Sequence, residues 1–211
     1  DYVNGRFFAT GTGGTILTST DGLQWTATNT NGNTSSIQNV AYGNGLYLAP
    51  AQSGTTGRAI LTSTDGFNWT QRITGAGAFG ANLRSVAANT SAIVTVGFNA
   101  TSSVSSFLRS TDGNSWNLSA SFSGQLNDID FGNTLFLAVN NSGTAYTSAN
   151  DGATWSQYAL ASGENLNGVR YANGLWVVTG ASGNSGRLRT SPTGLSGSWT
   201  SRISNGNVLN K

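Results

Sequence analysis

Short segments with apolar residues on alternate positions recur along the whole chain, separated by glycine- and asparagine-rich turns. One such segment reads IQNVAY (37–42), LRSVAA (83–88), LNDIDF (126–131) and LNGVRY (166–171) in successive copies. A second segment follows each of these after an Asn-Gly-like turn, as in NGLYLAP and NGLWVVTG. Period-two alternation between such turns predicts antiparallel β-hairpins. The chain shows no sustained 3.6-residue period, so we predict an all-β protein.

A tryptophan-containing turn marks each copy of a longer repeat. The segments STDGLQWT, STDGFNWT and STDGNSWN are near copies, and SANDGATWS and SPTGLSGSWT are looser versions. Their tryptophans recur at spacings of 44, 47, 39 and 44 residues, at Trp25, Trp69, Trp116, Trp155 and Trp199. A repeat of about forty residues accommodates four short strands with their turns, which is the size of a propeller blade.

Five such repeats account for the chain, and we predict one domain over residues 1–211, a five-bladed β-propeller with four antiparallel strands per blade. Within a blade, the chain is expected to run from the innermost strand outward. The predicted blades cover approximately 1–30 with 208–211, 37–73, 83–120, 126–159 and 166–203.

The two ends of the chain carry parts of one repeat. Tyr2 falls in the column that holds Tyr42, Ala88, Phe131 and Tyr171, and Val208 falls in the column that holds Ile37, Leu83, Leu126 and Leu166. We therefore predict that the N- and C-terminal segments pair and close the ring, which leaves no sheet edge open.

The tryptophan turns resemble the BNR or Asp-box repeat, Ser/Thr-x-Asp-x-Gly-x-Thr-Trp, which is best known from sialidases and other propellers. The first three turns lack one residue between Asp and Trp. The fourth places Asn150 where the pattern has Asp, and the fifth places Thr193 there and carries two extra residues. Polar, lysine-poor repeats of this style resemble phage and bacterial surface proteins.

The motif is expected to act as a turn device. A short Asp side chain accepts hydrogen bonds from nearby backbone N–H groups, and the Trp packs against a neighbouring strand or blade. We therefore assign a structural role to the five tryptophans and to Asp21, Asp65, Asp112 and Asp151. Each turn offers one carboxylate, whereas calcium takes six to eight oxygen ligands, so we expect no metal.

Composition narrows the functional classes further. Ten basic and eight acidic residues create too weak a positive field for a nucleic-acid partner, and no apolar run is long enough to insert into a membrane. The chain has no cysteine, so disulfides and thiolate metal sites are excluded. It also lacks methionine, even at position 1, which favours a processed form or a domain of a longer protein. We predict no cofactor.

The chain offers few residues that could act in catalysis. With no His and no Cys, only carboxylate chemistry remains. The acidic residues outside the turns are Asp1, Asp128, Asp130 and Glu164. A sialidase-like site would take its residues from Arg84, Arg170, Tyr42 or Tyr171, and Glu164. We expect Asp128 and Asp130 to be solvated or paired with Arg170, and we predict that the chain is no enzyme, with a sialidase-like glycoside hydrolase as an alternative.

The loops opposite the tryptophan turns vary most between repeats, and variable loops on a rigid scaffold are a common place for recognition. Their amides and aromatic rings suit sugar hydroxyls, although they are equally consistent with solvated turns. We predict a lectin-like binding module, extracellular or on a virion surface, with a glycan or cell-surface receptor as partner. A structural virion decoration or assembly scaffold that contacts other virion or surface proteins is the other alternative. The candidate ligand contacts are Arg58, Phe79, Arg84, Asn99, Asn140, Glu164 and Asn184.

Overall fold

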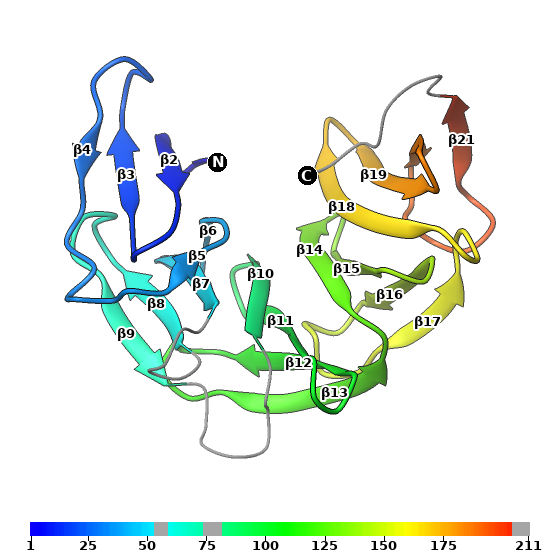
Figure 1. Cartoon of the computed structure of the whole chain (residues 1–211), viewed down its shortest axis with the longest axis horizontal. Coiled ribbons are helices and arrows are strands. Elements are labelled where there is room, and N and C mark those ends of the chain that lie inside the picture. The colour runs from blue at the N-terminus through cyan, green and yellow to red at the C-terminus, as the bar shows by residue number, and fades with distance from the viewer. Residues whose placement is uncertain (53–58, 74–81, 204–211) are drawn as a thin grey trace.

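Short antiparallel strands make up all the regular structure in the computed structural model. The structure describes residues 1–52, 59–73 and 82–203, and these residues contain no helix, so none of them forms a helix that could span a membrane. Five sheets surround a common centre, each with its first strand innermost (Figure 1). The fold is therefore the predicted five-bladed β-propeller, with the predicted strand order within each blade. The predicted pairing of residues 208–211 lies outside the described residues.

The blades are numbered in chain order. Blade 1 contains β1 (Tyr2–Val3), β2 (Arg6–Thr10), β3 (Ile16–Ser19) and β4 (Thr26–Ala27). Blade 2 contains β5 (Ser36–Ile37), β6 (Ala41–Gly43), β7 (Leu46–Gln52), β8 (Ala59–Ser63) and β9 (Thr70–Ile73). Blade 3 contains β10 (Asn82–Ala88), β11 (Ile93–Asn99), β12 (Val104–Ser110) and β13 (Asn117–Ser123). Blade 4 contains β14 (Leu126–Gly132), β15 (Leu135–Asn140), β16 (Thr144–Ser148) and β17 (Ser156–Ala159). Blade 5 contains β18 (Asn165–Ala172), β19 (Leu175–Ser182), β20 (Ser185–Ser191) and β21 (Thr200–Ile203).

The innermost strand of blade 2 is interrupted, so that β5 and β6 both pair with β7. Pro50 of β7 lies opposite the interruption, where its carbonyl accepts a hydrogen bond from the Gln38 amide at 3.3 Å. In an antiparallel strand, the N–H and C=O of one residue point to the same side. Because proline has no N–H, the inner strand loses one ladder hydrogen bond at this point and leaves the regular pairing.

The innermost strands of blades 3, 4 and 5 share an irregularity that the alternating pattern did not reveal. Their registers shift at Arg84, Asn127 and Asn167, one residue after Leu83, Leu126 and Leu166, which share a column of the repeat. A bulge re-aims the side chain that follows it. In this chain the residue after the bulge is Ser85, Asp128 or Gly168, and the side chains of Ser85 and Asp128 bond across neighbouring blades.

Asp128 uses that position to join three blades. Ser85 Oγ of blade 3 donates to Asp128 Oδ1 at 2.6 Å. On the other side, the Val169 amide and Arg170 Nη1 of blade 5 donate to Asp128 Oδ2 at 3.0 and 2.9 Å. Asp128 is fully buried, so the prediction of pairing with Arg170 is confirmed and the solvated alternative is wrong for this residue.

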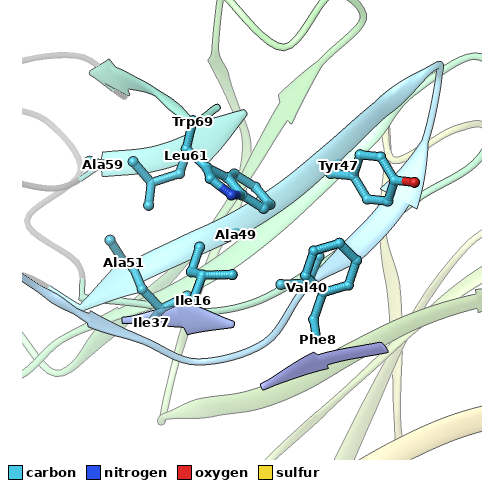
Figure 2. Close-up of a cluster of buried hydrophobic side chains, with 10 residues drawn as sticks. All are labelled: Phe8, Ile16, Ile37, Val40, Tyr47, Ala49, Ala51, Ala59, Leu61 and Trp69. Carbon is cyan, nitrogen blue, oxygen red and sulfur yellow. The ribbon is translucent and has the colours of Figure 1, made fainter. Parts of the chain in front are cut away.

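Apolar side chains fill the spaces between consecutive blades. Between blades 1 and 2, Phe8 and Ile16 face Tyr47, Leu61 and Trp69, as Figure 2 shows. Equivalent clusters lie between blades 2 and 3, blades 3 and 4, and blades 4 and 5, and each contains the turn tryptophan of the later blade. The turn tryptophans of blades 2 to 5 therefore pack on the preceding blade, which agrees with the predicted packing against a neighbouring strand or blade, whereas Trp25 of blade 1 is 41% exposed.

The first three tryptophan turns have the side-chain-to-backbone hydrogen bonds that the sequence predicted for them. In blade 1, Ser19 Oγ donates to Asp21 Oδ1 at 2.9 Å, and the amides of Leu23 and Gln24 donate to the same oxygen at 2.8 and 2.9 Å. Gly22 adopts φ +75°, which an L side chain rarely reaches. The turns around Asp65 and Asp112 repeat these contacts.

The fourth turn corrects the assignment of Asp151. Asn150, not Asp151, occupies the position that Asp21 has in the first turn. Asn150 Oδ1 accepts from Ser148 Oγ at 2.9 Å and from the Thr154 amide at 3.0 Å. The extra residue pushes Asp151 to φ 58° and turns its carboxylate toward blade 3. The Asp151 carboxylate therefore accepts a hydrogen bond from Asn89 of blade 3 instead of one from its own turn.

Candidate binding site

One position near the end of each innermost strand lies beside the turn that leads into the second strand of the blade; it is the last residue of β10 and the second-to-last residue of β1, β6, β14 and β18. In four blades this residue is aromatic and packs on the aromatic residue paired with it in the next strand. The ring centroids are 4.6 to 5.0 Å apart in the pairs Tyr2–Phe7, Tyr42–Tyr47, Phe131–Phe136 and Tyr171–Trp176. In blade 3 the equivalent pair is Ala88 and Ile93. The ring of aromatic side chains therefore has one gap, at Ala88.

A cavity of about 750 Å³ occupies that gap and is called the mouth cavity below. Ala88 forms part of its lining, Tyr42 of blade 2 and Phe131 of blade 4 contribute aromatic surface, and Tyr42 is 37% exposed. The turns at 43–45 and 89–91, with Thr134, Ala149 and Asp151, complete the lining. The mouth cavity thus combines two aromatic rings with amide, hydroxyl and carboxylate groups.

Glycines in the inner strands leave room for the next blade's side chain at this position. A Cβ on Gly132 would lie 2.1 Å from the Tyr171 ring, and one on Gly43 would lie 2.4 Å from the Ala88 Cβ. Ala88 therefore packs against Gly43 of the preceding blade in the same way as Tyr171 packs against Gly132, but with a smaller side chain.

The polar groups of the mouth cavity are held in place by hydrogen bonds across blades. Asn89 Nδ2 donates to Asp151 Oδ1 at 2.6 Å, and Asn89 Oδ1 accepts from the amides of Ser91 and Ala92 at 2.8 and 2.7 Å. Asn44 Nδ2 donates to the Thr111 carbonyl at 2.6 Å. Asp151 Oδ2 and Asn44 Oδ1 accept no hydrogen bond from the described residues. Each of these two oxygens could accept a hydrogen bond from a group placed in the mouth cavity.

The channel below the mouth cavity carries the charged residues of the inner strands. Asp1 Oδ2 accepts from the Val40 amide at 2.8 Å, and Asp130 Oδ2 accepts from the Tyr171 amide at 2.8 Å. Burial raises the pKa of the Asp130 carboxyl above its ordinary value, although the backbone N–H of Tyr171 and the charge of Arg170 act in the opposite direction. Within the described part of the chain, no three acidic side chains lie close enough to hold a metal ion.

The seven predicted ligand contacts do not gather at one place. Arg58 and Phe79 lie outside the described residues. Asn99 Oδ1 accepts from the Thr101 amide at 2.9 Å within its own turn, and Asn184 is exposed between β19 and β20. Arg84 is half-buried at a bulge, and burial lowers the pKa of its guanidinium.

Two of the predicted contacts have structural partners instead. Asn140 is buried: its Nδ2 donates to the Tyr146 hydroxyl at 3.2 Å, and its Oδ1 accepts from the Thr144 amide at 2.8 Å. Asn140 is therefore bonded within its own blade, and its role as a ligand contact stays a prediction. Both oxygens of Glu164 accept from Arg189, at 2.6 and 2.9 Å, and this lowers the pKa of the Glu164 carboxyl. Its bidentate pairing fixes Glu164 at the edge of blade 5.

Sequence reasoning missed the mouth cavity because it concentrated on the longest and most variable loops. The signal was present, since Ala88 stands alone among Tyr2, Tyr42, Phe131 and Tyr171 in the repeat alignment. A small residue in an aromatic column leaves a space that the neighbouring blades then line. The cavity opens on the face of the tryptophan turns, opposite the loops that were predicted to bind.

Comparison with known proteins places the fold but no family. Neither a family model nor a curated protein sequence matches the chain. Solved structures do match. YCF48 from Cyanidioschyzon merolae aligns at a TM-score of 0.63 with 14% identity, over 96% of this chain and 70% of that one. This chain shares its propeller fold.

Two further structures extend the comparison. A structure of YCF48 bound to D1 peptide aligns at a TM-score of 0.58 with 19% identity, over 89% of this chain and 60% of that one. A bifunctional GH43-CE protein of Bacteroides eggerthii aligns at a TM-score of 0.51 with 12% identity, over 79% of this chain and 27% of that one. At such low identity the likeness carries the fold alone, because propellers host many functions.

Proposed function

We propose that this chain is a non-catalytic binding module that recognises carbohydrate in the mouth cavity. The observation that carries the proposal is the single gap at Ala88 in an otherwise aromatic ring, which opens a cavity with aromatic walls and positioned polar groups. Its volume lies within the range of small-ligand sites, roughly 300–1,000 Å³.

The chemistry of the mouth cavity favours a sugar. The apolar face of a pyranose stacks on an exposed aromatic ring, and Tyr42 offers one. Sugar hydroxyls pair with amide and carboxylate oxygens, which Asn44 and Asp151 present without partners among the described residues. Because Asn89 already holds Asp151 in place, a ligand need not order that carboxylate.

The proposal of a non-catalytic role rests on the state of the acidic groups. Asp128 is buried and accepts from Ser85, Val169 and Arg170, and Glu164 is held by Arg189. Hydrolysis of a glycoside takes one carboxylic acid and a second free carboxylate on either side of the scissile bond. Neither of these two residues is free for such a role. We expect no turnover of a fluorogenic sialoside above background, and clear turnover that Glu164→Gln abolishes would contradict the proposal.

The partner and location follow from the proposed ligand. We propose a cell-surface or particle-surface glycan as the partner, with the protein itself outside the cell or on a virion. The lysine-poor composition and the repeat style support this setting. Antibody labelling of intact particles or unpermeabilised cells tests the location, and signal only after lysis would contradict it.

Glycan-array binding followed by calorimetry with the strongest array ligand tests the function. Tyr42→Ala should weaken binding about tenfold, the equivalent of one lost aromatic contact. Ala88→Tyr should abolish binding, because it restores the side chain that the other blades carry and fills the cavity above Gly43. Tyr2→Ala is the matched control, since Tyr2 lies in the same column but outside the mouth cavity, and it should bind like the parent chain.

Three results would contradict the proposed function. They are an array with no binder, a ligand whose affinity Ala88→Tyr leaves unchanged, and tight binding of an extended peptide instead of any sugar.

A further inference from the structure

The lining of the mouth cavity carries one charge, and that charge is negative. Asp151 is the single Asp, Glu, Lys or Arg residue among the lining residues, all of which belong to the described part of the chain. Arg109 of blade 3 contacts Asp151 through the backbone, since its Nε donates to the Asp151 carbonyl at 2.7 Å. The ion pairs of the described residues do not include the Asp151 carboxylate. The cavity therefore favours a cationic ligand group over an anionic one.

The carboxylate is also held in place while one of its oxygens stays free. Asn89 Nδ2 donates to Asp151 Oδ1, whereas Asp151 Oδ2 accepts no hydrogen bond from the described residues. Asp151 is half-buried, so a ligand that enters the cavity removes water from this oxygen. A charged oxygen that loses water needs a donor, and a charged donor is the stronger partner. An ammonium group supplies three donors and no acceptor.

The aromatic walls of the cavity suit the same group. Tyr42 of blade 2 and Phe131 of blade 4 contribute rings to the lining. Their ring centroids lie 4.8 Å from those of Tyr47 and Phe136, so packing within each blade holds both rings in place. The faces of aromatic rings attract cations, most strongly where water is displaced. An ammonium group therefore finds attraction from the walls as well as from Asp151.

The fourth tryptophan turn explains why this carboxylate is available. In the first turn, Asp21 Oδ1 accepts from Ser19 and from two backbone amides, so that carboxylate serves the turn itself. In the fourth turn Asn150 takes over this task, and the extra residue leaves Asp151 with its side chain directed at blade 3. The insertion thus adds a charge to the mouth cavity at no cost to the turn.

We infer that the mouth cavity selects a sugar that carries a protonated amine, that is, an amino sugar without an acetyl group, and that Asp151 determines this preference. The inference rests on the proposed function, because it names the class of sugar that the same cavity takes. Acidic sugars such as sialosides are disfavoured, since their carboxylate would approach Asp151 with no cation in the lining to offset it.

Titration with matched methyl glycosides, followed by NMR, tests the inference. The probes are the 2-amino, 2-hydroxy and 2-acetamido glycosides of the gluco, galacto and manno series, which differ within a series at carbon 2 alone. At about pH 6 the amine is protonated, because its pKa lies near that of an α-amino group. In at least one series the amino glycoside should bind about tenfold more tightly than the other two, since a charge-assisted hydrogen bond replaces a neutral one.

Asp151→Asn should remove this preference and leave the fold intact. Asn tolerates the positive φ of 58° at this position, and its Oδ1 still accepts from Asn89. The amino glycoside should then bind no more tightly than its hydroxy counterpart. The matched control is Asp21→Asn, which removes the same charge from a turn outside the mouth cavity and should keep the full preference.

The outcomes separate this inference from the proposed function. If none of the glycosides binds, the proposed function fails and the inference fails with it. If glycosides bind but the amino form has no advantage in any series, or if Asp151→Asn keeps the advantage, the inference alone is overturned. An equal loss of the advantage in Asp21→Asn would also overturn it, because the preference would then come from net charge and not from contact with Asp151.

Discussion

At the scale of single residues, the fold depends on a few side chains whose oxygens replace missing backbone partners. In the tryptophan turns one oxygen of Asp21, Asp65 or Asp112 accepts several N–H donors. Asn150 and Thr193 perform the same task in the two divergent turns. The turn needs an acceptor at this position, and a negative charge is not essential.

The negative charge of the Asp65 carboxylate nevertheless makes the free energy of unfolding depend on pH. Hydrogen bonds from Asn68, Phe67 and Ser63 hold the pKa of the Asp65 carboxyl well below its ordinary value. A carboxyl with a lowered folded-state pKa stabilises the protein fully above its unfolded pKa, about 4, and the stabilisation is lost as pH falls through the folded-state pKa. Acid should therefore reduce the free energy of unfolding.

Replacing Asp65 by Asn should remove its share of this acid sensitivity. We expect Asp65→Asn to fold, as the turn with Asn150 does, and to lose less stability than the parent chain between pH 7 and pH 3. Urea unfolding at the two pH values measures the difference. An identical loss in both proteins would show that Asp65 is not a source of the pH dependence.

At the scale of strands and blades, the bulges in the inner strands determine how neighbouring sheets are joined. Asp128 receives donors from two other blades because the bulge at Asn127 re-aims it. Asp128→Ala would leave Ser85 Oγ and the Val169 amide buried without that acceptor. The free energy of unfolding should fall by about 3 kcal/mol.

Arg170→Ala separates the backbone contribution from the ion pair. The Arg170 side chain is 44% exposed, and Asp128, which is fully buried, keeps its hydrogen bonds from Ser85 and the Val169 amide when Arg170 is replaced. Chemical denaturation should therefore show a much smaller loss than for Asp128→Ala. If the two substitutions cost the same, the ion pair and not the bond to Val169 would hold these blades together.

At the scale of the whole molecule, the repeats predicted the architecture because each blade carries the same local sequence pattern. The alternating apolar residues, the Asn-Gly turns and the recurring tryptophans act within single hairpins, and five copies place them around a ring. The bulges could not be predicted, since nothing in LRSV or LNDI separates a bulged strand from a regular one. Pro50 could be read from the sequence, but the interruption that it causes in the inner strand of blade 2 could not be predicted from it.

The mouth cavity is also a property of the whole ring. It depends on Ala88, which is unremarkable in its own strand and informative only beside the four aromatic residues of its column. Predicted contacts such as Asn140 and Glu164 were chosen for their chemistry alone, and the surrounding blade engages both of them.

Titration of ¹³C-alanine-labelled protein with a panel of methyl glycosides, followed by NMR, most directly tests whether this ring binds sugar through its one gap. A binding glycoside should shift the Ala88 methyl resonance in proportion to occupancy and leave the buried Ala138 methyl unchanged. Shifts confined to alanines outside the mouth cavity, such as Ala181 beside the β19–β20 turn, would contradict the account, as would a panel that shifts none.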